Sequence, residues 1–126
     1  MKPDVTSPFK GKTGLRRLFN AFAYSLAGYA AAFRHEAAFR QLTLLALVLV
    51  PLACWLDVSR GERALMVAVV LLTLVIELFN SAIEAAVDHT SLERPPLAGR
   101  AKDMGSAAQL TGLAIVAAVW GLILFG

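Results

Sequence analysis

Four polar side chains lie at helical spacing within one apolar segment of the sequence. Glu77, Asn80, Glu84 and Asp88 follow one another at intervals of three, four and four residues. At 100° per residue they occupy roughly 80° of one helical face. Because a carboxylate inside a membrane span is energetically costly, this pattern indicates a functional site or a buried polar partner. One glutamate could act as a base nearer mid-bilayer and the other as a metal ligand nearer the cytoplasm. The alternative is pairing with arginine or lysine for assembly alone.

A third carboxylate, Glu36, stands at the start of another apolar segment. We expect it to lie at a depth similar to that of Glu84. Two carboxylates together with phosphate oxygens make a suitable Mg²⁺ site. The two residues therefore predict metal binding at the membrane interface.

Basic and acidic residues also precede the last apolar segment, within LAGRAKDMGSAA at 97–108. Lys102 beside Asp103 at the start of a helix suits recognition of phosphate or of metal-linked phosphate, with backbone N–H groups adding positive potential. The alternative is that Arg100 and Lys102 anchor the segment on the cytoplasmic side.

The composition requires an apolar solvent around the chain. Hydrophobic residues make up 58% of the 126 residues, and a chain this short cannot bury so many in one core. Three apolar segments, at 37–56, 64–87 and 107–125, are each close to the roughly 20 residues that cross a bilayer. The single cysteine excludes an intrachain disulfide and a Cys/His metal site. The basic residues do not stripe a soluble face, so we expect no nucleic-acid partner.

The N-terminal part divides into a tail and an amphipathic helix. Residues 1–14 are rich in proline, glycine and lysine and predict a flexible tail. Over residues 15–35, bulky apolar side chains gather on one helical face and basic ones on others, which predicts a helix at the cytoplasmic membrane interface. We therefore expect an all-α membrane protein with one domain over 15–126, made of a surface helix and three spans.

The distribution of Lys and Arg predicts the orientation. Seven lie at or before Arg40, two lie between Asp57 and Arg63, and three lie in the 88–106 segment. By the positive-inside rule the N-terminus and the 88–106 loop are cytoplasmic. The 57–63 turn and the C-terminus then face outward.

Four strings of residues resemble those of a known family. These are EAAFRQ at 36–41, ACWLDV at 53–58, ELFNSAIEAAVD at 77–88 and GRAKDMGSAA at 99–108. In order and spacing they are similar to the small integral-membrane diacylglycerol kinases of bacteria, over roughly residues 15–125. Three positions depart from that pattern, because Leu42 replaces an acidic residue and Ala27 and Ala30 replace basic ones.

The resemblance implies a homotrimer in the bacterial inner membrane that phosphorylates diacylglycerol with MgATP to give phosphatidic acid. Its active sites are composite and lie between neighbouring subunits at the cytoplasmic interface. It implies that Glu77 is the general base, that Asn80 supports it, and that Glu36 and Glu84 are the metal ligands. The implied ATP contacts are Arg17, Tyr24, Glu36, Glu84, Glu93, Lys102 and Asp103. The implied lipid contacts are Arg17, Ala21, Ser25, Ala38, Phe39, Arg40, Gln41, Trp55, Leu56, Asp57, Val58, Arg63, Glu77, Ser106 and Trp120.

The physical interpretation agrees with the resemblance. Phosphoryl transfer needs positioning, neutralised phosphate charge and an oriented hydroxyl, so we expect Glu77 to accept or orient the lipid hydroxyl proton. Undecaprenol is the alternative lipid alcohol. A small proton-coupled transporter would predict four spans and a carboxylate in the first span, and neither occurs in the sequence. A purely structural scaffold leaves the four polar residues from Glu77 to Asp88 without a role.

Overall fold

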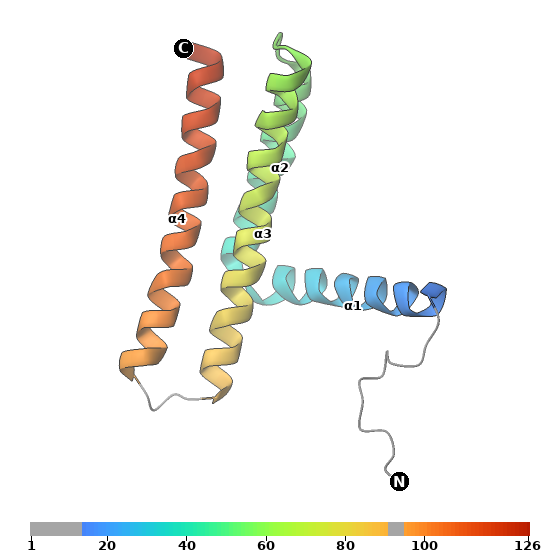
Figure 1. Cartoon of the computed structure of the whole chain (residues 1–126), viewed down its shortest axis with the longest axis vertical. Coiled ribbons are helices and arrows are strands. Elements are labelled where there is room, and N and C mark those ends of the chain that lie inside the picture. Colours follow the sequence, from blue (N-terminus) through green and yellow to red (C-terminus); the bar gives the residue numbers. More distant parts are fainter. Residues whose placement is uncertain (1–13, 91–94) are drawn as a thin grey trace. The chain divides into compact units, whose positions relative to one another are not determined.

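The computed structural model describes residues 14–90 and 95–126, and these ranges contain helices and no strand. The helices are α1 (Gly14–His35), α2 (Ala37–Trp55), α3 (Arg60–Thr90) and α4 (Pro95–Phe125) (Figure 1). The predicted all-α class and the number of helices are confirmed. The predicted tail lies outside the described residues except for Gly14. The chain divides into two compact units at the bond between His35 and Glu36.

The first unit contains α1, whose large apolar side chains are exposed. Its basic residues Arg16 and Arg17 lie near its start, as predicted. An amphipathic helix with an uncovered apolar face suits a membrane interface. The exposed apolar side chains are Leu15, Leu18, Phe19, Phe22, Tyr24, Leu26, Tyr29 and Phe33.

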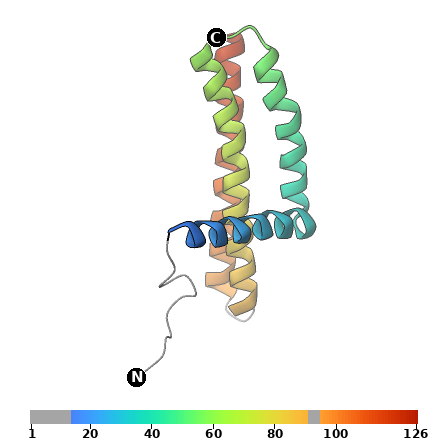
Figure 2. The ribbon, with the colours of Figure 1, turned by 90° about the vertical axis from the view of Figure 1, so that its right-hand side faces the viewer.

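In the second unit, α2 and α4 each pack against α3 (Figures 1 and 2). The core lies towards the end where α2 turns into α3, and all three helices contribute to it. There the indole Nε1–H of Trp120 donates a hydrogen bond to the carbonyl of Met66, at 3.1 Å. The buried core residues are Ala46 and Ala53 of α2, Met66, Val69 and Val70 of α3, and Trp120 of α4.

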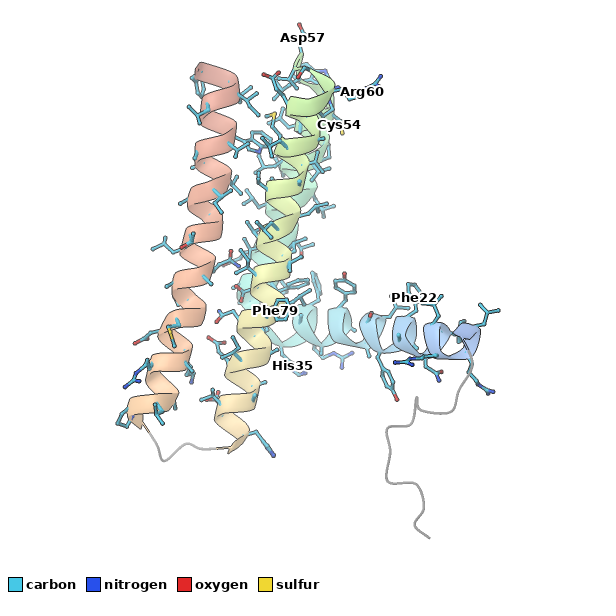
Figure 3. The ribbon with its side chains drawn as sticks, viewed as in Figure 1. Phe22, His35, Cys54, Asp57, Arg60 and Phe79 are labelled. Carbon is cyan, nitrogen blue, oxygen red and sulfur yellow. The ribbon has the colours of Figure 1, made fainter. Side chains whose placement is uncertain are left out.

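The turn between α2 and α3 satisfies its own backbone groups. Ser59 and Glu62 form a capping box, in which each backbone N–H donates to the other side chain, at 2.9 and 3.1 Å. The Arg63 guanidinium donates to the carbonyls of Ala53 and Leu56 at the end of α2, at 3.0 and 2.8 Å. The Ala53 carbonyl is one of those that a helix end leaves unpaired, and the Leu56 carbonyl also accepts from the Val58 N–H, at 3.1 Å. Figure 3 shows Cys54, Asp57 and Arg60 at this end of the unit, with Phe79 farther along α3.

Helices α2, α3 and α4 are long and apolar enough to span a membrane. Only 22, 33 and 17% of their most apolar windows are buried within the chain, so most of their apolar surface requires lipid or another subunit. The protein is therefore an integral membrane protein. At about 1.5 Å per residue, α3 and α4 are each about 46 Å long. Because the hydrocarbon core is about 30 Å thick, both helices extend beyond it.

The start of α4 differs from the prediction. The apolar segment predicts a span from 107, whereas α4 begins at Pro95. The additional turns are polar, so hydropathy does not reveal them, but proline suits the first turn of a helix and alanine, arginine and lysine favour its interior. Lys102 and Asp103 consequently lie in the second and third turns of α4, not in a loop before it. Backbone N–H groups at that depth are bonded within the helix, so phosphate recognition there depends on the side chains.

We expect Trp120→Phe to lower the free energy of unfolding by about 1 kcal/mol, because it removes the hydrogen bond to Met66 and leaves that packing largely filled. Thermal unfolding in detergent micelles measures the change. Trp55→Phe is the matched control, since Trp55 is 80% exposed and should barely move the midpoint. Equal shifts in both variants would contradict the assignment of Trp120 to the core.

Candidate functional site

The site centres on the face of α3 that meets α4. Glu77 is 4% exposed and Asn80 is 9% exposed, so both are buried. The Glu77 Oε1 atom accepts a hydrogen bond from Gln109 Nε2 of α4, at 3.0 Å. Its Oε2 atom accepts a longer one from Ser81 Oγ, at 3.4 Å. The buried carboxylate is thus held from its own helix and from the neighbouring one.

Gln109 is a site residue that the sequence analysis missed. Its Nε2 atom also donates to the backbone carbonyl of Thr73, at 3.0 Å. The signal in the sequence is an amide side chain within an otherwise apolar span, since such residues usually bond to another helix. Which residue it bonds cannot be read from spacing, because the two helices are separated by a loop.

Asn80 lies at a close approach of α3 and α4. A Cβ atom at Gly105 would collide with Asn80 Oδ1, so a larger residue at 105 would force the Asn80 side chain or the helix to shift. The Oδ1 atom is buried and has no hydrogen-bond partner in the described part of the chain. Beside it is a hollow of about 230 Å³, lined by Ile76, Phe79, Asn80, Ile83, Gly105 and Ala108. The surface of the hollow is apolar, so the Asn80 amide oxygen is buried beside it and does not face into it.

Charged residues gather farther along α3 and α4, towards the end of α3 and the start of α4. Lys102 Nζ and Asp88 Oδ1 are 2.8 Å apart, with both side chains about half exposed. The charges of Glu36, Glu77, Asp88 and Lys102 all act on the Glu84 carboxylate. Glu36 reaches this region from the N-cap of α2, where its extended backbone separates α1 from α2. The structure therefore brings together the carboxylates predicted from separate segments.

The number of carboxylates at this end suits a metal ion that phosphate oxygens also bind. Within residues 14–90 and 95–126, no group of three His, Cys, Asp or Glu side chains is placed to hold a metal by itself. Magnesium in phosphate-transfer sites is commonly bound by one or two carboxylates plus substrate phosphates. Glu36 and Glu84 supply that number of carboxylates from α2 and α3, with Lys102 near enough to interact electrostatically with Glu84.

A family comparison identifies the type of protein that carries this arrangement. The family model described as prokaryotic diacylglycerol kinase matches residues 23–124. The chain belongs to the prokaryotic diacylglycerol kinase family. The match covers α2 and α3 and most of α1 and α4, and includes Glu36, Glu77, Glu84 and Lys102.

Curated diacylglycerol kinases from several bacteria are similar over nearly their whole length. The Pseudomonas aeruginosa protein is 66% identical over 120 residues, covering 95% of this chain and 98% of the relative. The Haemophilus influenzae protein is 49% identical over 113 residues, covering 90% and 96% of the two chains. The Escherichia coli K12 protein is 45% identical over 113 residues, covering 90% and 93%.

Other residues expected to contact lipid in a diacylglycerol kinase lie at the far end of the spans. Arg63 is about 21 Å along α3 from Glu77, and its guanidinium is bonded to carbonyls of the turn. Trp120 is part of the core. Trp55 and Asp57 are exposed at this end, and Leu56 and Val58 are half-buried.

The remaining predicted contacts of the kinase are distributed over three helices. On α1, Arg17, Ala21 and Tyr24 are exposed, and the Ser25 hydroxyl donates to the carbonyl of Ala21 at 3.0 Å. At the start of α2, Phe39 is buried, Arg40 is half-buried, and Ala38 and Gln41 are exposed. On α4, Asp103 and Ser106 are exposed. Glu93 lies outside the described residues.

Proposed function

We propose that this protein transfers the γ-phosphoryl group of ATP to the primary hydroxyl of diacylglycerol, giving phosphatidic acid, at the cytoplasmic face of a bacterial inner membrane. The observation that carries the proposal is the buried Glu77 carboxylate, held by Gln109 and Ser81 in an apolar span, in a chain of the diacylglycerol kinase family. The names of its relatives support the choice of lipid.

In the proposed reaction, Glu77 orients the lipid hydroxyl and accepts its proton as the oxygen attacks the γ-phosphorus. General bases of this kind typically contribute about 10²- to 10⁴-fold to the rate. The Asn80 amide beside Glu77 helps to position the hydroxyl. Its oxygen is buried against Gly105 without a hydrogen-bond partner in the described ranges, so this role requires the amide to turn towards the hydroxyl.

The charged end of α3 and α4 would receive the nucleotide. Glu36 and Glu84 would hold Mg²⁺, which when bound neutralises phosphate charge. Lys102 would contact the phosphates after leaving Asp88. That exchange costs little, because the pair is exposed to solvent, which screens the attraction between its charges. Arg17, Tyr24, Glu93 and Asp103 remain proposed nucleotide contacts on the strength of the family resemblance.

We infer a homotrimer with sites completed between subunits. The small buried fraction of α2 and α4 supports this proposal, because each leaves apolar surface on which another copy can pack. The proposed orientation has the N-terminus and the loop between α3 and α4 in the cytoplasm, with the C-terminus outside. This places the charged residues on the side from which ATP arrives.

A phosphotransfer assay tests the function directly. Purified protein in mixed micelles should transfer labelled phosphate from ATP to diacylglycerol, and removal of Mg²⁺ with a chelator should abolish the transfer because phosphate charge is then not neutralised. Undecaprenol serves as the competing alcohol in the same micelles. Preferential labelling of undecaprenol would overturn the proposed substrate, and absence of any lipid product would overturn the reaction.

A further inference from the structure

We propose that Gln109 is a positioning residue, whose amide holds the Glu77 carboxylate in the orientation that receives the lipid hydroxyl proton. This inference rests on the proposed function, in which Glu77 is the base. Gln109 lies on α4, and the family resemblance implies no role for it.

The hydrogen bonds fix the orientation of the amide. Gln109 Nε2 lies 3.0 Å from Glu77 Oε1 and 3.0 Å from the Thr73 carbonyl oxygen. Both neighbours are acceptors, so the NH₂ end of the amide must face them. Thr73 and Glu77 are one turn apart on α3 and are 1% and 4% exposed. A donor that uses both hydrogens on one rigid helix leaves the carboxylate little freedom to rotate.

The energetics of Gln109 favour a functional role over a packing role. Its Oε1 atom is buried and has no hydrogen-bond partner in the described part of the chain. A buried unsatisfied oxygen costs about 1–3 kcal/mol, which a methionine or leucine side chain would avoid. A Cβ atom at Gly112 would lie 2.7 Å from Ile76 Cδ1 and 3.1 Å from this oxygen, so glycine leaves room beside the amide. An apolar residue would fill the interface between α3 and α4 without the free-energy cost of a buried unpaired oxygen. The contribution that is specific to the amide is therefore its two hydrogen bonds to α3.

The position of Gln109 along α4 also relates the two halves of the site. It follows Lys102 by seven residues, which is two turns, so the two side chains lie on the same face of one helix. Lys102 bonds Asp88 and Gln109 bonds Glu77, so each bonds a carboxylate of α3. The register of α3 and α4 thereby sets the separation between the phosphate-binding end and the base.

Gln109→Met tests the inference, because methionine has a similar volume and cannot donate. In micelles with diacylglycerol and MgATP, we expect kcat to fall about ten- to a hundredfold, the range for losing a hydrogen bond to a charged group. We expect the KM values for diacylglycerol and for MgATP to change less than about twofold, since the substitution should not alter how tightly either substrate binds. The thermal midpoint should stay the same or rise. Thr111→Val is the matched control: its hydroxyl is exposed on α4 and bonds only its own helix at Ala107, so kcat should be unchanged.

The outcomes separate this inference from the proposed function. An unchanged kcat in Gln109→Met, or a fall that only matches a loss of folded protein, would overturn the positioning role. Glu77→Gln is measured in parallel, and full turnover in that variant would instead refute Glu77 as the base. In the Glu77→Gln background, Gln109→Met should cause no further loss, because the two residues act as one unit. A further tenfold loss there would show that Gln109 acts elsewhere and would also overturn the inference.

Discussion

Glu77→Gln should lower kcat by about 10²- to 10⁴-fold, which is the usual contribution of a positioned general base. Glutamine has nearly the same shape and can still accept the hydrogen bond from Gln109, so the packing of α3 against α4 is preserved. What the substitution removes is the capacity to take a proton. The KM for MgATP should hardly change, because Glu77 lies on the lipid side of the proposed site. Steady-state assays in mixed micelles measure both quantities.

The control applies the same substitution elsewhere on α3. Glu62 lies about 22 Å from Glu77 along the helix and belongs to the capping box of the α2–α3 turn. Glu62→Gln should retain full turnover, with at most a small loss of stability. Turnover of Glu77→Gln within a factor of two of the unchanged protein would refute the base assignment.

Gly105→Ala should reduce turnover by about a hundredfold or more, because its new methyl group cannot coexist with Asn80 Oδ1 in the present geometry. Either Asn80 leaves its position or α4 moves away from α3, and the second change would also stretch the bond between Gln109 and Glu77. Displacements of about 1 Å can cost 10²-fold in rate when reacting groups must be aligned. The assay is the same, supplemented by thermal unfolding.

Two further variants show whether the collision is the cause. Gly121→Ala places a methyl group in open space on the same helix, so it should leave turnover unchanged and, if anything, stabilise α4. Asn80→Ala in the Gly105→Ala background removes the obstructing amide. It should restore the thermal midpoint while turnover stays low, since the amide itself is lost. A double variant that stays as unstable as Gly105→Ala would contradict the proposed collision.

The helices could be predicted from the sequence because the patterns that indicate them each lie within a single segment. Apolar runs of bilayer length predicted the three spans, and helical spacing placed Glu77, Asn80 and Glu84 on one face of α3. Both arguments depend only on the geometry of one helix. The same patterns did not predict where α4 begins. Hydropathy indicates which residues lie in the membrane, and it does not indicate where the helix begins outside it. Residues 95–106 are helical but too polar to mark a span.

Contacts between helices could not be predicted from patterns within one segment. The bond from Gln109 to Glu77 joins residues 32 positions apart, and it depends on the register of α3 against α4. Arg63 is a second case, since the structure shows its guanidinium bonded to the carbonyls of Ala53 and Leu56, while the lipid contact that the resemblance implies for it stays a prediction. Gln109 donates to a carboxylate and a backbone carbonyl, and Arg63 donates to backbone carbonyls at the end of a helix. Their partners become evident only once the helices are packed.

The self-sufficient turn between α2 and α3 has a consequence for biogenesis. Its capping box and Arg63 bond backbone groups of the turn with residues from the hairpin alone, so the turn forms these hydrogen bonds without residues of α4. Glu77, in contrast, gains its Gln109 donor only when α4 docks. Until then an intramembrane carboxylate lacks its firmest hydrogen bond, which favours recruitment of the last helix. In the proposed kinase, docking of α4 therefore completes the packing of the three spans and the hydrogen bonding of the base in a single step.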